Sequence, residues 1–88
     1  MLVTLKIETT PGQQSTTIKL IGRIETEHLS ELRALLDPVG GSIVLDLSEV
    51  SLVNLDVVRF LITCETQGIQ LLNCSAFIRK WIDRERQD

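Results

Sequence analysis

The chain has 88 residues, of which 43% are apolar and only three are aromatic, so we expect one domain with a core of Leu, Ile and Val. Twelve acidic side chains against nine basic ones give a net charge of −3, which leaves no basic footprint for binding nucleic acid. No apolar run approaches the ~20 residues of a membrane-spanning helix, and the first residues lack a signal-peptide pattern, so we expect a cytoplasmic protein without membrane insertion.

The first part of the chain predicts a β-hairpin. Residues 2–8 alternate between apolar and polar side chains, which is typical of a strand with one solvated face. Pro11-Gly12 marks a turn within residues 9–14, and the alternation resumes over residues 15–22.

A first helix is expected after the hairpin. Thr26 is a suitable N-cap, and leucines recur at helical spacing along one face: Leu29, Leu32, Leu35 and Leu36. The helix should end near Asp37-Pro38, because a residue before proline disfavours helical angles. Gly40-Gly41 then leads into the next strand.

Residues 42–47 predict a central strand. Its run of Ile43-Val44-Leu45 is typical of a strand that is covered on both faces. Residues 48–53 are expected to connect this strand to a second helix.

The second helix is predicted from Asn54 to Gln67. Asn54 is a good N-cap, and Asp56 falls in the first turn, where the helix dipole favours negative charge. Gly68 suits a left-handed C-cap. The side chains that we expect this helix to bury are Val57, Val58, Leu61 and Cys64.

A short strand over residues 69–73 and a third helix capped by Ser75 complete the pattern. The stripe of this helix contains Phe77, Ile78, Trp81 and Ile82. Phe77 and Trp81 fit either core packing or a partner interface, since aromatic side chains dominate interface energetics. Residues 83–88 are expected to form a charged, fraying tail.

The predicted fold is therefore α/β, with one domain over residues 1–88. The order ββαβαβα implies a mixed four-stranded sheet with three helices packed mainly on one face.

Nothing in the sequence assembles a catalytic site or a metal site. His28 is expected to be solvated, and Cys64 and Cys74 stand ten residues apart without a Cys-x-x-Cys pair, which favours reduced, buried thiols. Asp46 ends the central strand, where we expect it to hold the following turn rather than serve as a metal ligand or base. Ser48 and Ser51 are expected to be turn residues, although their hydroxyls are also candidate phosphoacceptors. We expect no enzyme activity, no cofactor and no metal.

Three segments in order resemble the STAS domain family, which includes bacterial anti-sigma factor antagonists and the cytoplasmic tails of sulfate transporters. They cover nearly the whole chain: Leu20-Ile21-Gly22-Arg23-Ile24, Ile43-Val44-Leu45-Asp46-Leu47-Ser48-Glu49-Val50 and Gly68-Ile69-Gln70-Leu71-Leu72. The resemblance implies a non-catalytic domain that regulates a protein partner.

This chain departs from the family at its phosphorylation switch. Where switching members carry Asp-Ser-Ser-Gly, this chain has Asn54-Leu55-Asp56-Val57, so neither phosphoacceptor serine is present. Leu55 and Asp56 occupy those two positions and cannot be phosphorylated there. Asp56 either imitates phosphoserine with one fixed charge or only stabilises the helix start, and the sequence leaves both interpretations open.

The resemblance implies an anti-sigma factor or a kinase-like ATPase as partner, with control of transcription as the output. The surface that we predict to bind it comprises Ser51, Asn54, Leu55, Asp56 and Arg59. One alternative is a scaffold subunit of a bacterial lipid-transport ABC-type complex, which the loss of both serines suits and in which the partner is the transporter ATPase subunit. A second is a sensor of a nucleotide or lipid near the helix N-terminus, although Asp56 opposes an anionic ligand there. The sequence leaves open whether the chain forms a homodimer.

Overall fold

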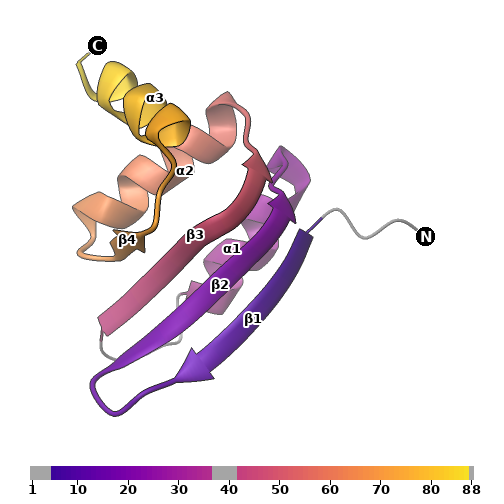
Figure 1. The fold of residues 1–88 in the computed structure, drawn as a ribbon, viewed down its shortest axis with the longest axis vertical. Helices are drawn as coiled ribbons and strands as arrows, with labels where there is room; N and C mark the ends of the chain where they lie inside the picture. Colours follow the sequence, from indigo (N-terminus) through magenta and orange to yellow (C-terminus); the bar gives the residue numbers. More distant parts are fainter. Residues whose placement is uncertain (1–4, 37–41, 88) are drawn as a thin grey trace.

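A four-stranded mixed sheet is the frame of the fold in the computed structural model, which describes residues 5–36 and 42–87 (Figure 1). The strands lie in the order β1-β2-β3-β4, with β1 antiparallel to β2 and the remaining pairs parallel. Their bounds are Leu5–Pro11 for β1, Ser15–Arg23 for β2, Ser42–Leu52 for β3 and Gln70–Leu72 for β4.

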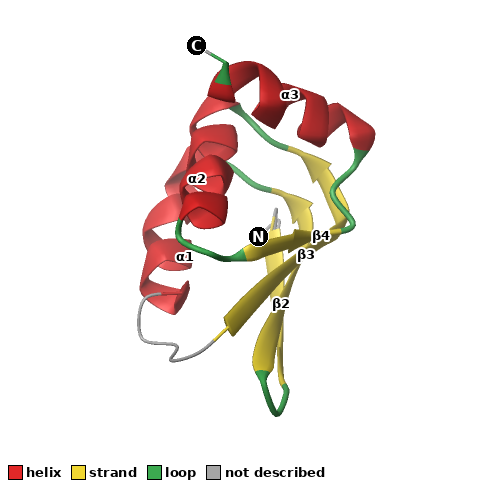
Figure 2. Ribbon diagram, turned by 90° about the vertical axis from the view of Figure 1, so that its left-hand side faces the viewer, coloured by secondary structure: helices red, strands yellow, loops and turns green. Residues whose placement is uncertain are grey.

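Helices follow β2, β3 and β4 and lie together on one side of the sheet (Figure 2). A short 3-10 helix, η1 (Thr26–His28), runs into α1 (Leu29–Leu36), and α2 (Leu55–Thr66) and α3 (Ala76–Arg86) complete the fold. The predicted fold class and element order are therefore confirmed. None of the helices within residues 5–36 and 42–87 has the length and apolarity that crossing a bilayer requires.

The core lies between the helices and one face of the sheet. The buried sheet residues on that face are Ile18, Leu20, Ile43, Leu45 and Leu47. Val44, between two of them, is only half-buried, so the prediction that the central strand is covered on both faces is wrong. The opposite face carries charged groups, among them Lys19, whose Nζ lies 2.6 Å from Glu49 Oε2.

Strand β3 extends five residues beyond its predicted end at Leu47, so residues 48–52 belong to the strand rather than to a connection. The register with β2 shifts twice: Lys19 pairs with Asp46 but Ile21 with Glu49, and a second shift follows Gly22. Each shift places an extra residue in β3, which marks a β-bulge that keeps the strand paired while it bends.

The hairpin turn is tighter than predicted. Strand β1 continues to Pro11, and the Gly12 N–H donates to the Ser15 carbonyl at 2.9 Å. Proline is tolerated here because β1 is an edge strand, where a missing N–H breaks no ladder. Leu5 and Ile7 are half-buried while Lys6 is exposed, as the alternation predicted, whereas residues 2–4 lie outside the described part of the chain.

The helix ends mostly follow the sequence. Ser75 Oγ accepts from the Ile78 N–H at 3.3 Å, and Gly68 has a φ of 92° after α2, as predicted for its left-handed C-cap. Helix α1 ends at Leu36, and the predicted stop at Asp37-Pro38 and the Gly40-Gly41 pair lie outside the described residues.

Helix α3 is longer and less buried than predicted. It is regular to Arg86, so the tail predicted to fray from residue 83 is helical over most of its length. Ile78 and Ile82 are buried, whereas Phe77 is 59% exposed and meets Trp81 edge to face, with ring centroids 5.8 Å apart. Trp81 packs against the core. The predicted apolar face of this helix is therefore confirmed for Ile78, Trp81 and Ile82 but not for Phe77.

Candidate functional site

The corner between β3 and α2 lies directly beside η1. Asn54 caps α2, because its Oδ1 accepts from the Val57 N–H at 3.0 Å. Its Nδ2 also donates to Thr26 Oγ1 at 3.0 Å, and Thr26 Oγ1 in turn donates to Asp56 Oδ2 at 2.9 Å. Three polar side chains thus join the start of η1 to the start of α2. Thr26 is 28 positions from Asn54 and 30 positions from Asp56 in the sequence.

Thr26 does not cap its own helix, which corrects the prediction for this residue. The N-cap is Glu25, whose N–H donates to Nδ1 of His28 at 2.9 Å. His28 is therefore half-buried and hydrogen-bonded rather than simply solvated. Since Glu25 and His28 satisfy the helix start between them, the Thr26 hydroxyl is left to bind α2.

Apolar side chains flank this polar corner. Leu52 at the end of β3 is 48% exposed and Leu55 at the start of α2 is 38% exposed, while Val53 between them is buried. Ser51 is exposed beside the second register shift of β3. A shallow hollow of about 390 Å³ runs from Leu52 to the η1 start and is bordered by Asn54.

Arg59 lies one turn along α2 from Leu55 and faces α3 as well as solvent. Its Nε is 3.5 Å from Glu85 Oε1, so its charge is partly balanced by α3. A groove of about 490 Å³ between α1 and α2 is bordered by Arg59, Asp56 and Thr26. The structure thus brings Asn54 and Asp56 into one network and leaves Arg59 at its margin.

Asp46 has a structural role, but not the predicted one of holding a turn after the strand, because it lies within β3. Its Oδ1 accepts from the Ser48 N–H at 2.9 Å and from Asn73 Nδ2 at 3.4 Å, beside the first register shift of β3. The Ser48 hydrogen bonds, followed by that of Asn73, hold the pKa of the Asp46 carboxyl below its usual value. It therefore holds a bulge rather than a turn.

The two cysteines are both free thiols. Cys64 is buried, and this burial raises its pKa to about 11; Cys74 is half-buried, and its pKa is also raised by burial. Neither is therefore an activated nucleophile at neutral pH. Among residues 5–36 and 42–87, no three side chains of His, Cys, Asp or Glu gather in a way that could hold a metal ion.

Sequence reasoning missed two members of the corner. The sequence predicts Thr26 only as a cap, since nothing local reveals that its hydroxyl contacts a residue 30 positions away. It predicts Leu52 within a connection, and the only local signal for an exposed contact there is an apolar side chain next to Ser51.

Comparison with known proteins finds no match for this chain. No family model matches the chain, and no curated protein matches its sequence.

Proposed function

We propose that this protein is a STAS-like, non-catalytic interaction domain of the cytoplasm that binds a protein partner through the β3–α2 corner. The support is the resemblance of three ordered segments together with the ββαβαβα order and the placement of the corner. Ser51, Asn54, Leu55 and Asp56 form the centre of the binding surface, with Arg59 at its edge.

One observation carries this proposal: two exposed leucines, Leu52 and Leu55, are close in sequence to a hydrogen-bonded polar network at the start of α2. Leu52 and Leu55 offer apolar area to a partner, and the hydrogen bonds among Thr26, Asn54 and Asp56 hold the start of α2 against η1. Interfaces combine an apolar centre with hydrogen-bonding groups, and a surface that is already ordered loses less entropy on binding.

By resemblance the partner is an anti-sigma factor or a kinase-like ATPase, and binding would control transcription. Serine phosphorylation at the usual positions would not regulate this contact, because Leu55 and Asp56 stand there. The affinity would instead be fixed by the shape and charge of the corner.

A matched pair of leucines tests the proposed surface. Leu55 and Leu72 are both 38% exposed, but Leu72 lies on β4, away from the corner. In affinity capture from the protein's own cells, Leu55→Glu should abolish recovery of an ATPase partner, whereas Leu72→Glu should retain it. Equal recovery with both variants would contradict the proposal, as would loss with both in folded proteins.

A scaffold role in a lipid-transport ABC-type complex is the second candidate. It is favoured by the Asp56 contact, since a carboxylate bonded to Thr26 at 2.9 Å gives the corner one permanent arrangement that needs no modification. The same capture separates the two functions: a transporter ATPase subunit identifies the scaffold, and a histidine-kinase-like ATPase identifies the anti-sigma factor antagonist.

A further inference from the structure

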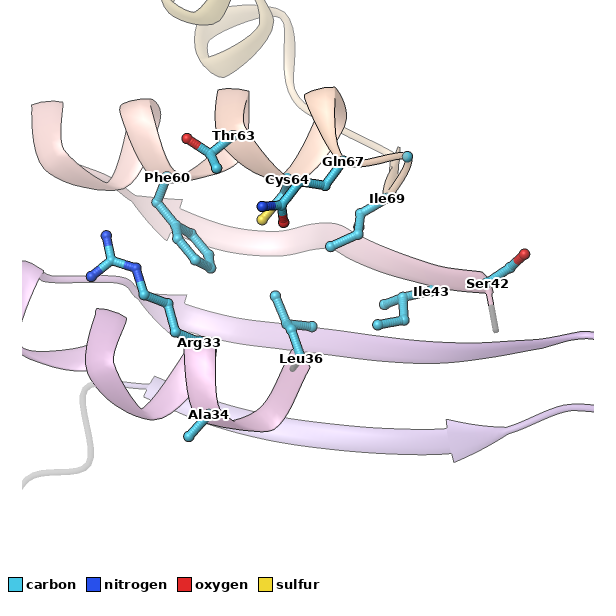
Figure 3. Close-up of a pocket in the computed structure, with 11 residues that line it drawn as sticks. Arg33, Ala34, Leu36, Ser42, Ile43, Phe60, Thr63, Cys64, Gln67 and Ile69 are labelled. Carbon is cyan, nitrogen blue, oxygen red and sulfur yellow. The ribbon is translucent and has the colours of Figure 1, made fainter. Parts of the chain in front are cut away.

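A second hollow lies between α1 and α2, at the end of these helices away from the β3–α2 corner. Its volume is about 860 Å³, and its lining includes Leu36 from α1, Cys64 from α2, Ile43 from β3 and Ile69 after α2 (Figure 3). None of the residues proposed to bind a protein partner lines it.

The hollow lies between α1 and α2, and α2 packs closely on α3 but much less on α1. The sheet below supplies a buried floor at Ile43, while Leu36 and Ile69 remain half-buried at the walls. Half-buried apolar walls favour an apolar occupant, because such an occupant removes them from water.

The lining of this hollow includes one cation, Arg33, whose side chain is exposed. The Arg33 guanidinium lies 5.6 Å from the centre of the Phe60 ring, and the two side chains reach toward each other from α1 and α2 (Figure 3). Arg79 and Arg86 both pair with a carboxylate, whereas Arg33 has no ion pair with any described residue. An anionic group at this point would therefore meet a charge that the described part of the fold does not neutralise.

The cysteine that α2 contributes to the lining of the hollow is uncharged. Cys64 is buried, and burial raises the pKa of its thiol to about 11, so it stays protonated at neutral pH. A protonated thiol behaves as a small apolar group and does not compete with a ligand anion for Arg33.

We propose that this hollow binds a small amphipathic carboxylate, such as a free medium-chain fatty acid, with its carboxylate on Arg33 and its chain against Leu36, Ile43 and Ile69. Its volume falls within the roughly 300 to 1,000 Å³ of small-molecule sites. This site is separate from the proposed partner surface, because it is formed by the C-terminal parts of α1 and α2, whereas the partner surface is at the start of α2.

Octanoate is a suitable probe, with octan-1-ol as its uncharged counterpart. In ¹⁵N-¹H spectra of the full chain, octanoate should cause saturable shifts at the backbone amides of Arg33, Leu36, Cys64 and Ile69. The dissociation constant should be about 1 mM or tighter. Shifts confined to other regions, or the absence of saturation at about ten times that concentration, would overturn the proposal.

Two substitutions separate the charge from the cavity. Arg33→Gln should weaken octanoate binding about tenfold and leave octan-1-ol unchanged, since only the carboxylate loses a charged partner. Arg84→Gln is the control, because Arg84 is exposed on α3 and outside the hollow. Thr63→Trp, which fills the exposed rim, should remove binding of both probes while the fold persists. Unchanged octanoate affinity in Arg33→Gln or in folded Thr63→Trp would refute the site.

Discussion

The Thr26 hydroxyl donates a 2.9 Å hydrogen bond to the Asp56 carboxylate across 30 positions of the chain. Asp56 therefore does two things at once: it places negative charge in the first turn of α2 and ties that turn to η1. This hydrogen bond explains the presence of an acidic residue at position 56 on structural grounds, without any imitation of phosphoserine.

Removing the Thr26 hydroxyl should loosen this tie without disturbing the core. We expect Thr26→Val to lower the free energy of unfolding by about 1 kcal/mol, because an exposed hydrogen bond contributes that much at most and both partners regain water. Urea denaturation measures the loss. Thr26→Ser keeps the hydroxyl and should match the parent protein; a loss in the serine variant equal to that in the valine variant would implicate the methyl group instead.

The charge of Asp56 can be separated from its hydrogen bond once a partner is in hand. Asp56→Asn keeps an acceptor for Thr26 but removes the charge, whereas Thr26→Val does the reverse. If the carboxylate acts by fixing the corner, Thr26→Val should weaken partner binding and Asp56→Asn should not. Isothermal titration of both variants checks this, and the opposite order of effects would support imitation of a phosphoserine.

Asn54 should contribute more to the free energy of unfolding than an ordinary N-cap does. Asn54→Ala removes the 3.0 Å acceptor for the Val57 N–H and the donor to Thr26, so we expect a loss of about 1 to 2 kcal/mol in the free energy of unfolding. Ser75→Ala is the comparison, since Ser75 caps α3 through one bond of 3.3 Å. A smaller loss for Asn54→Ala than for Ser75→Ala would show that the network at the corner adds nothing.

The sequence predicted those parts of the fold that depend on near neighbours. The caps at Asn54 and Ser75 and the left-handed Gly68 each depend on a few adjacent residues, and all three are confirmed. The predicted N-cap at Thr26 is one position from the observed one at Glu25, because threonine is by propensity a stronger N-cap than glutamate.

The remaining errors depend on what the elements pack against. Strand β3 continues through residues 48–52 only because β2 stays paired with it across two register shifts, which a single strand's sequence does not reveal. Phe77 has helical spacing with Trp81, yet its 59% exposure depends on where α3 lies on α2. Predicting that Leu52 and Thr26 lie at one exposed corner requires both the local sequence and the packing of the elements against one another.

The two thiols should differ in reactivity. Burial raises the pKa of Cys64 to about 11, so its thiol is almost entirely protonated at pH 7.5, and it is also shielded from solvent. Cys74 is half-buried, so iodoacetamide should reach it first. Mass spectrometry of the native protein should show one alkylation, at Cys74, before any at Cys64. A Cys64→Ser variant should label at the same initial rate as the parent; a slower rate would place the first reaction at Cys64.

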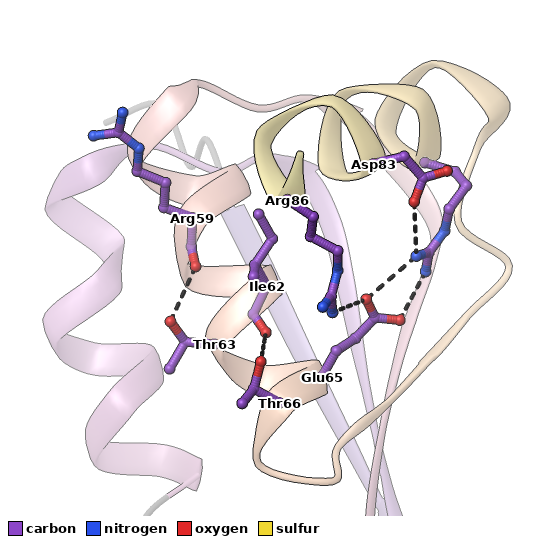
Figure 4. Close-up of polar contacts among 8 residues, drawn as sticks. Arg59, Ile62, Thr63, Glu65, Thr66, Asp83 and Arg86 are labelled. Carbon is purple, nitrogen blue, oxygen red and sulfur yellow. Dashed lines mark hydrogen bonds and ion pairs between the residues drawn. The ribbon is translucent and has the colours of Figure 1, made fainter. Parts of the chain in front are cut away.

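Glu65 joins α2 to two arginines of α3 (Figure 4). Its carboxylate accepts from Arg79 at 3.2 and 2.9 Å and from Arg86 at 2.8 Å. The Arg79 hydrogen bond is the main reason that the pKa of Glu65 is lowered in the folded protein, with Arg86 adding to it. Because Arg86 lies in the segment predicted to fray, this contact also explains why the helix persists there.

A lowered pKa means that the folded state favours the ionised carboxylate. Its contribution to stability is therefore complete above the unfolded value of about 4.3 and is lost as the pH falls through the lower folded value. We expect Glu65→Gln to cost about 1 kcal/mol at pH 7, and the difference from the parent should shrink toward zero near pH 3. Urea denaturation at both pH values measures this. Glu31→Gln, at an exposed position of α1, is the control for removing a carboxylate outside this contact. A constant difference for Glu65→Gln at both pH values would mean that packing rather than charge holds α3 on α2.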